Sequence, residues 1–208
     1  FGVEKGQSLA LLGRNGAGKS TTMKAIIGIA PAKRGRVSVR GTPMQKFTPD
    51  RIAREGVGFV PEDRQIFPEH SVEDNLKIAI KTGVGGRIDW TLEKIYDVFP
   101  ILASMRGRMG GRLSGGEQQM LTIARTLMGN PSCVLLDEPS EGLAPIIVEE
   151  MANSIRALKG EGVSVILCEQ NLHFALGVAD RAYIIEKGQI RFGGSMAELA
   201  ANDSLREQ

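Results

Sequence analysis

Short apolar runs recur along the chain and are separated by segments with helical patterns. These runs lie at residues 9–12, 57–60, 133–136, 163–168 and 183–185. A run such as 133–136, with no polar alternation, is typical of a strand that is buried on both faces of a parallel sheet. The order of strand, helix, strand, helix therefore predicts an α/β sheet with ligand groups at the carboxyl ends of its strands.

The clearest helical signal begins at Ser114. Ser114 and Glu117 form a capping box, apolar residues then recur at helical spacing, and Gly129-Asn130-Pro131 ends the helix. Further helices are predicted at residues 21–27, 49–55, 145–159 and 172–176, the last of them capped by Asn171.

Two segments differ from this alternation. Residues 35–41 alternate apolar and polar side chains between glycines, which predicts a half-buried strand at a sheet edge. Residues 66–112 contain helical signals and no strand pattern, so they predict a helical insert, with Trp90 in its core. Near the end of the chain, Lys187-Gly188 is typical of a hairpin turn.

Composition limits the function classes. The 208 residues carry a net charge of +2, which gives no field that requires nucleic acid or an anionic membrane as partner. Cys133 and Cys168 lie in separate apolar runs, so we expect reduced thiols and no metal site. No apolar run is long enough to cross a bilayer, and no signal peptide is evident. Any work at a membrane would need another chain to hold this one there.

Residues 13–20 match the phosphate-binding pattern GxxxxGKS at every fixed position. The match follows an apolar run and precedes a helical segment, which is the context that phosphate binding requires. Its glycines let backbone N–H groups turn inward around a polyphosphate, and the helix N-terminus adds partial positive charge. Lys19 is expected to reach the β and γ phosphates, and the Ser20 hydroxyl to coordinate Mg²⁺.

Asp137 and Glu138 end a buried apolar run as an adjacent acidic pair. On a strand, neighbouring side chains point in different directions, so the two carboxylates can hold two roles. Beside a phosphate loop, Asp137 is suited to Mg²⁺ and Glu138 to orienting the attacking water and accepting its proton.

Three motifs in order resemble the ATP-binding-cassette (ABC) ATPases: residues 13–20, the signature at residues 113–119, and the segment 135–140. The resemblance covers nearly the whole chain. It implies an α/β P-loop NTPase (RecA-like) core sheet, a helical insert subdomain and a small antiparallel β subdomain that is truncated at the N-terminus. It implies one ABC ATPase domain over residues 1–208, with residues 1–65 and 113–208 as core and β subdomain and residues 66–112 as helical subdomain.

The resemblance also implies two cassettes that sandwich two ATP molecules, each site being shared between chains. One chain supplies the phosphate loop, formed by Gly13, Arg14, Asn15, Gly16, Ala17, Gly18, Lys19, Ser20 and Thr21. The other supplies the signature residues Ser114, Gly115, Gly116 and Glu117. The implied Mg²⁺ residues are Ser20, Glu62 and Asp137, and the implied catalytic residues are Glu138, Gln170 and Lys19. Most members of the family have glutamine in place of Glu62 and histidine in place of Gln170, and Gln170 cannot carry a proton.

Finer detail resembles the ATPase subunits of branched-chain amino acid importers, notably residues 61–68 and 138–145. ATPases of urea and short-chain amide importers resemble it nearly as well, and a soluble ABC clamp of DNA repair or translation and a regulatory, non-hydrolysing subunit are further alternatives. The resemblance to importers implies three partners. They are transmembrane permease subunits, a second ABC ATPase subunit that forms a homo- or heterodimer with this chain, and, indirectly, a solute-binding protein. The same resemblance implies no nucleic acid partner and a cytoplasmic place, peripheral on the inner face of the cell membrane. The adenine-stacking aromatic residue is expected upstream of Phe1.

Overall fold

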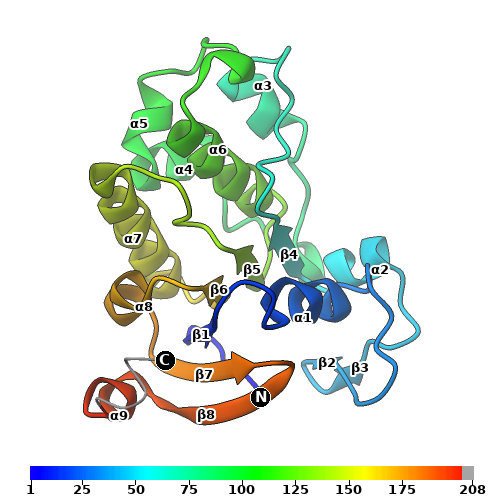
Figure 1. The fold of residues 1–208 in the computed structure, drawn as a ribbon. Helices are drawn as coiled ribbons and strands as arrows, with labels where there is room; N and C mark the ends of the chain where they lie inside the picture. Colours follow the sequence, from blue (N-terminus) through cyan, green and yellow to red (C-terminus); the bar gives the residue numbers. More distant parts are fainter. Residues whose placement is uncertain (203–208) are drawn as a thin grey trace.

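A six-stranded sheet lies at the centre of the computed structural model, which describes residues 1–202 (Figure 1). Its strand order is β4-β5-β6-β1-β7-β8, parallel throughout except for the antiparallel pair β7 and β8. The strands are β1 (Ser8–Leu12), β4 (Val57–Val60), β5 (Cys133–Asp137), β6 (Ser164–Glu169), β7 (Arg181–Glu186) and β8 (Gln189–Ser195). The predicted α/β class with a mainly parallel sheet is therefore confirmed.

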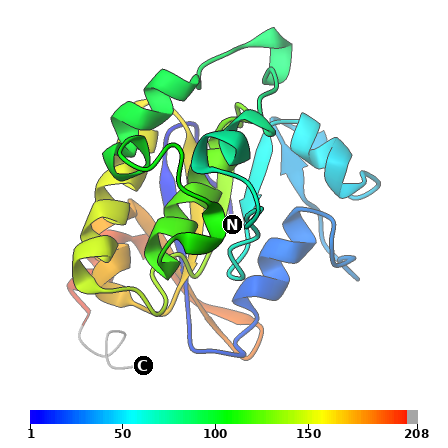
Figure 2. The same ribbon diagram turned by 90° about the horizontal axis from the view of Figure 1, so that it is seen from above.

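Helices cover both faces of the sheet (Figure 2). One face carries α1 (Lys19–Ile26) and α2 (Pro49–Arg54). The other face carries α6 (Gly115–Leu127), α7 (Pro145–Gly160) and α8 (Leu172–Val178). A short helix, α9 (Met196–Ala200), follows β8. Each predicted helix outside residues 66–112 is present, with ends that differ from the expectation by one or two residues, as at α1, which begins at Lys19.

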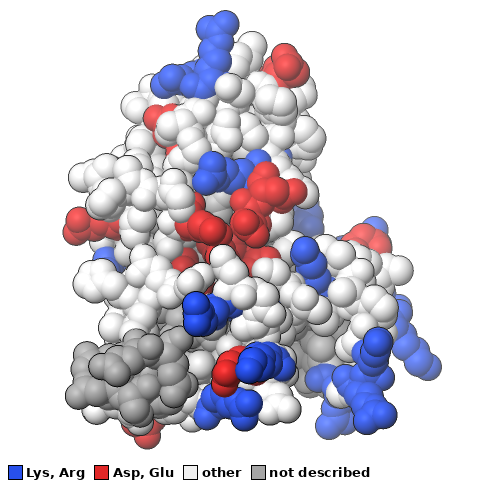
Figure 3. Space-filling view, in the orientation of Figure 1, with Lys and Arg blue, Asp and Glu red and all other residues white. Residues whose placement is uncertain are grey.

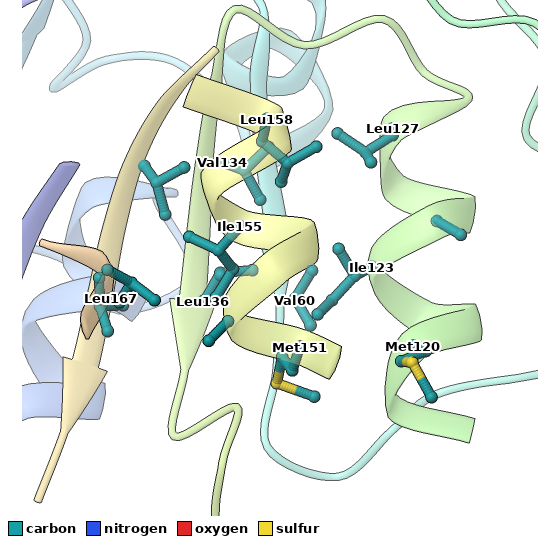
Figure 4. Close-up of a cluster of buried hydrophobic side chains, with 14 of the residues drawn as sticks. Val60, Met120, Ile123, Leu127, Val134, Leu136, Met151, Ile155, Leu158 and Leu167 are labelled. Carbon is teal, nitrogen blue, oxygen red and sulfur yellow. The ribbon is translucent and has the colours of Figure 1, made fainter. Parts of the chain in front are cut away.

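The continuous apolar runs bury side chains on both faces because successive residues of a strand point to opposite sides. In β1, Leu9 and Leu11 pack on the α1 side, whereas Ala10 and Leu12 pack on the side of α6 and α7. Figure 4 shows the core on the side of α6 and α7, in which side chains of β4, β5 and β6 meet those of α6 and α7. This double burial fixes the positions of the strand ends, where the polar motifs lie.

Residues 66–112 form short helices above this core (Figure 1). They are α3 (Val72–Lys77), η1 (Val84–Gly86), α4 (Leu92–Val98), α5 (Pro100–Ala103) and η2 (Gly110–Arg112). Within this described segment the only β-type pairing is an isolated bridge between Ser71 and Met109. Trp90 is 2% exposed, so its burial is as predicted, but the cluster that it joins is shared with the sheet and is not a separate core of the insert. The division of the chain into subdomains stays a prediction.

The prediction for residues 35–41 is only partly right. Val37 and Val39 are half-buried, as the alternation predicted, but the strand is limited to β2 (Ser38–Val39). It pairs with β3 (Thr42–Pro43) in a separate two-stranded sheet and does not reach the edge of the main sheet. Arg40 and Gly41, both in the left-handed region at φ 49° and 79°, turn the chain back after two residues.

Local signals for turns and caps are confirmed. The Ser114 hydroxyl accepts a hydrogen bond from the Glu117 N–H, and the Glu117 carboxylate accepts one from the Ser114 N–H at 2.6 Å. Lys187 and Gly188 have φ values of 49° and 76°, as a two-residue hairpin turn of type I′ requires.

Both cysteines are free thiols, and burial raises the pKa of the Cys168 thiol. The described residues contain no group of three or more His, Cys, Asp and Glu side chains that would hold a metal by themselves. Within the same part of the chain, none of the helices has the length and apolarity to span a membrane.

Candidate active site

The predicted site residues other than those of the signature gather where four neighbouring parallel strands end. The phosphate loop follows β1, Asp137 and Glu138 lie at the end of β5, and Gln170 follows β6. Glu62 lies two residues beyond β4, close enough to Asp137 to raise the pKa of its carboxyl. Because parallel strands present their carboxyl ends at one edge, strand order alone assembles these groups.

The loop after β1 is held in shape by the hairpin of β7 and β8. A Cβ atom on Gly13 would lie 2.4 Å from the Ile185 carbonyl oxygen, so only glycine fits there. On the other side of the loop, the Gly188 N–H donates to the Ala17 carbonyl at 2.9 Å. The left-handed φ values of Gly16 (80°) and Gly18 (111°) complete the turn into α1. This support from the hairpin was not predicted from the sequence.

Lys19 points back into the loop. Its side chain is almost fully buried, and its ammonium group donates to the carbonyls of Gly13 at 2.7 Å and Arg14 at 3.3 Å. The same group forms an ion pair with the Glu138 carboxylate at 2.9 Å. The fold thus brings together the cation of the loop and the proposed base from β5.

Ser20 and Asp137 meet as well, through a hydrogen bond of 3.0 Å from the Ser20 hydroxyl to the carboxylate. Burial raises the pKa of Asp137, the bond from Ser20 opposes this rise, and the charges of Glu138 and Glu62 add to it. A crowded, desolvated carboxylate of this kind gains from a divalent cation in contact with it.

Glu138 is a buried residue with an unusual backbone conformation. Its φ of 46° is in the left-handed region, which costs energy for a residue with a side chain and is common at functional sites. Its N–H donates to the Cys168 carbonyl, which ties it to β6. A side-chain hydrogen bond with Glu138 raises the pKa of Glu141, and burial adds to the rise.

Glu169 is the last residue of β6 and lies at the edge of the site, and the sequence predicted no role for it. Its buried carboxylate accepts hydrogen bonds from the N–H groups of Ser140, Gln170 and Asn171. Burial raises its pKa, and these hydrogen bonds oppose the rise. Glu169 therefore fixes the turns that carry Glu138 and Gln170. An acidic residue at the end of an otherwise apolar run was the signal that could have identified it.

A hollow opens beside Glu138 and is lined by Glu62, Arg64, Gln119, Glu138, Pro139 and Glu141. Figure 3 shows acidic side chains gathered at the centre of the corresponding face, next to a basic group. Arg64 is the single cation of this lining.

The signature residues lie apart from the loop. They begin α6, on the opposite face of the sheet from α1, and no hydrogen bond or ion pair of the described residues joins 114–117 to 13–21. The two signature glycines have packing partners of their own: a Cβ on Gly116 would meet Ile147, and one on Gly115 would meet Arg64. Within one chain, the loop and the signature do not form a single site.

The residues present suit Mg²⁺ and a nucleotide phosphate. Mg²⁺ prefers hard oxygen ligands and is commonly held by one or two protein groups together with phosphate oxygens, which matches the Ser20 and Asp137 pair. The buried ammonium of Lys19 and the N-terminal end of α1 supply positive charge for the phosphates.

Comparison with known proteins agrees with this geometry. Residues 1–141 match the family described as ABC transporter. The chain belongs to that family. This ABC ATPase is 40% identical over 205 residues to the high-affinity branched-chain amino acid transport ATP-binding protein BraG of Pseudomonas aeruginosa, covering 99% of this chain and 88% of BraG.

Other relatives differ in their named tasks. The probable branched-chain amino acid transport ATP-binding protein LivF of Archaeoglobus fulgidus is 32% identical to this ABC ATPase, over 99% of this chain and 87% of LivF. The lipopolysaccharide export system ATP-binding protein LptB of Escherichia coli K12 is 33% identical, over 98% of this chain and 86% of LptB.

Solved structures give the same fold. This ABC ATPase superposes on the ADP conformation of MJ1267, an ATP-binding cassette of an ABC transporter, with a TM-score of 0.81 and 27% identity, covering 99% of this chain and 88% of MJ1267. The expected P-loop NTPase fold is thereby confirmed.

Proposed function

We propose that this ABC ATPase is the ATP-hydrolysing subunit of an importer for branched-chain or related amino acids. The observation that carries the hydrolytic part is the pairing of Lys19 with Glu138 and of Ser20 with Asp137 at one edge of the sheet. The amino-acid part is supported by the 40% identity to BraG over nearly the whole chain.

The loop residues have distinct tasks in this proposal. Backbone N–H groups of residues 13–18 and the start of α1 surround the phosphates, and Lys19 neutralises charge on the β and γ groups. Ser20 and Asp137 hold Mg²⁺, with Glu62 beside them. Bound Mg-ATP supplies the electrophilic phosphorus and the oxygens that complete the metal's coordination.

Glu138 and Gln170 act on the reacting groups. Glu138 orients the attacking water and accepts its proton, a contribution of about 10²- to 10⁴-fold in rate. Gln170, exposed at the end of β6, donates a hydrogen bond to the γ-phosphate and holds no proton during the step. The left-handed conformation of Glu138 and its bond to Cys168 keep the base in place.

A second cassette completes the site. Ser114, Gly115, Gly116 and Glu117 begin α6, and the N-terminus of this 13-residue helix favours an anion. Because they lie apart from their own loop, they serve the phosphates bound by a partner chain, either a second copy or a similar ATPase. There they stabilise the charge on the departing γ-phosphate.

The remaining partners follow from the importer assignment. Transmembrane permease subunits dock on residues 66–112, the segment that contributes no strand to the core sheet, and hold the chain at the inner face of the cell membrane. A solute-binding protein contributes indirectly, and nucleic acid has no role. Urea or amide import remains the alternative with the same site, and LptB shows that similar chains also serve export.

Glu138→Gln tests the hydrolytic assignment. The variant keeps the size of the side chain and loses the carboxylate, so we expect ATP binding and an ATP-dependent dimer with turnover reduced at least about 10²-fold. Sedimentation with Mg-ATP and phosphate release measure both properties. Full hydrolysis by the variant, or a strict monomer, would contradict the assignment.

Reconstitution tests the solute. Together with the permease and solute-binding components of its own importer, the chain should drive ATP-dependent uptake of leucine, isoleucine or valine into vesicles. Glu138→Gln in the same vesicles is the matched control. Uptake of urea or an amide in place of amino acids would support the alternative importer.

A further inference from the structure

Arg64 lies in the segment between β4 and the helical residues, in an unusual backbone conformation. Its φ of 46° makes it one of five non-glycine residues in the described chain with a left-handed backbone, and Glu138 is another. Its carbonyl accepts a hydrogen bond from the Ile66 N–H at 2.6 Å. A strained turn of this kind persists only where surrounding contacts hold it.

The guanidinium of Arg64 connects two functional segments. Its Nη2 donates to the Glu141 carbonyl at 3.5 Å, in the turn that follows Glu138. On the other side it lies against the start of α6, where a Cβ atom on Gly115 would come within 2.4 Å of Nη1. The turn itself is closed by the Glu141 N–H, which donates to the Glu138 carbonyl at 3.2 Å. Arg64 thus bridges the signature end of α6 and the turn of the proposed base.

Arg64 is also the one positively charged residue in the lining of an acidic hollow. The hollow that it lines contains the carboxylates of Glu62, Glu138 and Glu141 and no other cation. Among the ion pairs of residues 1–202, none within 4.0 Å includes Arg64, so its guanidinium lines the hollow beside the three carboxylates without being paired to any one of them. Lys19 reaches Glu138 from the loop side of the site.

We propose that Arg64 is a positioning residue for ATP hydrolysis, which holds the Glu138–Glu141 turn against the N-terminal end of α6 and offsets the crowded negative charge beside Glu138. The proposal deepens the function given above and rests on the role of Glu138 as base. In this role Arg64 does not contact the phosphates. Its loss should therefore slow the chemical step and leave nucleotide binding in place.

The experiment compares Arg64→Ala, Arg64→Lys, Glu141→Gln and the double variant Arg64→Ala/Glu141→Gln in the purified protein. Steady-state phosphate release gives kcat and KM, calorimetry gives the ATP Kd, and thermal melting checks folding. For Arg64→Ala we expect kcat to fall about 10- to 100-fold, because small displacements of catalytic groups have effects of this size. The ATP Kd should change by less than about twofold, since the groups that hold the phosphates are untouched.

Charge repair separates positioning from simple packing. Arg64→Lys keeps the cation, so its kcat should be at least about threefold higher than that of Arg64→Ala. The double variant Arg64→Ala/Glu141→Gln lacks one of the three carboxylates, so its kcat should also be at least about threefold higher than that of Arg64→Ala, because the effects of substitutions at residues in contact are not additive. Arg87→Ala is the matched control, because Arg87 is an exposed arginine paired with Asp89 outside the hollow. It should leave kcat unchanged.

Defined results overturn the proposal. These are an unchanged kcat in Arg64→Ala, an equal loss of ATP affinity, or a loss that neither Lys nor the second substitution repairs. If Arg64→Ala does not melt cooperatively, Arg64→Gln, which keeps a hydrogen-bond donor without the charge, is judged by the same measurements. Glu138→Gln is measured beside them: full hydrolysis by that variant removes the proposed base, whereas full hydrolysis by Arg64→Ala or Arg64→Gln removes only the role of Arg64.

Discussion

Asp137 is a single residue at which stability and function conflict. Its carboxylate is desolvated by burial and lies near Glu138 and Glu62, so the folded chain raises its pKa above that in the unfolded chain. The ionised form is then costly to the fold when the nucleotide and metal are removed. Active sites commonly retain such groups because the ligand requires them.

We predict that Asp137→Asn stabilises the protein in the absence of nucleotide and metal while it abolishes Mg²⁺-dependent stabilisation by ATP. A gain of about 1 kcal/mol would raise the Tm by about 2–4 °C for a chain of this size. Because the folded pKa is raised, the cost of the carboxylate is full at neutral pH and disappears below its unfolded value, near 3.8.

Thermal melts from pH 7 downward, with and without Mg-ATP, check this prediction. The gain in Tm over the unmodified protein should shrink as the pH falls. Asp97→Asn, which changes an aspartate in the helical segment, serves as the control. A variant that melts lower than the unmodified protein at pH 7 would show that the hydrogen bond from Ser20 outweighs the burial of the charge.

At the scale of elements, the β7–β8 hairpin and the phosphate loop form one unit. Gly13 lies so close to the Ile185 carbonyl that a methyl group cannot be accommodated without moving backbone. The Gly188 N–H then holds the loop from the hairpin turn. The geometry of the loop therefore depends on β7 and the turn after it, which lie near the other end of the sequence.

We predict that Gly13→Ala destabilises the fold by about 1–3 kcal/mol through overpacking and weakens ATP binding by displacing the loop. Chemical denaturation and calorimetry measure the two effects. Gly107→Ala is the matched control, because nothing lies within 4 Å of a Cβ at that position and its φ is not left-handed. Equal stability and affinity of the two variants would show that the loop does not need the hairpin.

At the scale of the whole molecule, one chain holds half of each proposed site. The loop and the signature lie on α1 and α6, on opposite faces of the sheet (Figure 2). A two-fold dimer would place each signature against the partner's loop and so form two equivalent sites.

Mixing two inactive variants tests this arrangement. Lys19→Ala removes the loop cation, and Ser114→Arg blocks the signature end of α6. In a mixed dimer one site is doubly damaged and the other intact, so equal mixing should restore roughly a quarter of the unmodified rate if the sites act independently. Each variant alone is the control. No recovery after subunit exchange, confirmed by sedimentation, would contradict sites shared between two copies of this chain.

The sequence alone determined the local features of this protein. The glycines of the phosphate loop, the capping box of Ser114 and Glu117, and the turn at Lys187 and Gly188 are each set by residues close together in the chain. Continuous apolar runs predicted the buried strands because residues on both faces had to be apolar. At residues 35–41 the alternation predicted the half-buried positions, but it did not predict that the strand would be only two residues long and would pair with residues 42–43.

Only the tertiary structure decided which of these features meet. Ser20 and Asp137 are 117 residues apart and come within hydrogen-bond distance because β5, β6 and β1 are neighbours in the sheet. Strand order, the hairpin behind Gly13, the turns fixed by Glu169 and the bridge made by Arg64 depend on long-range packing. Local patterns specify what each segment is, and the sheet that they form together specifies what lies beside it.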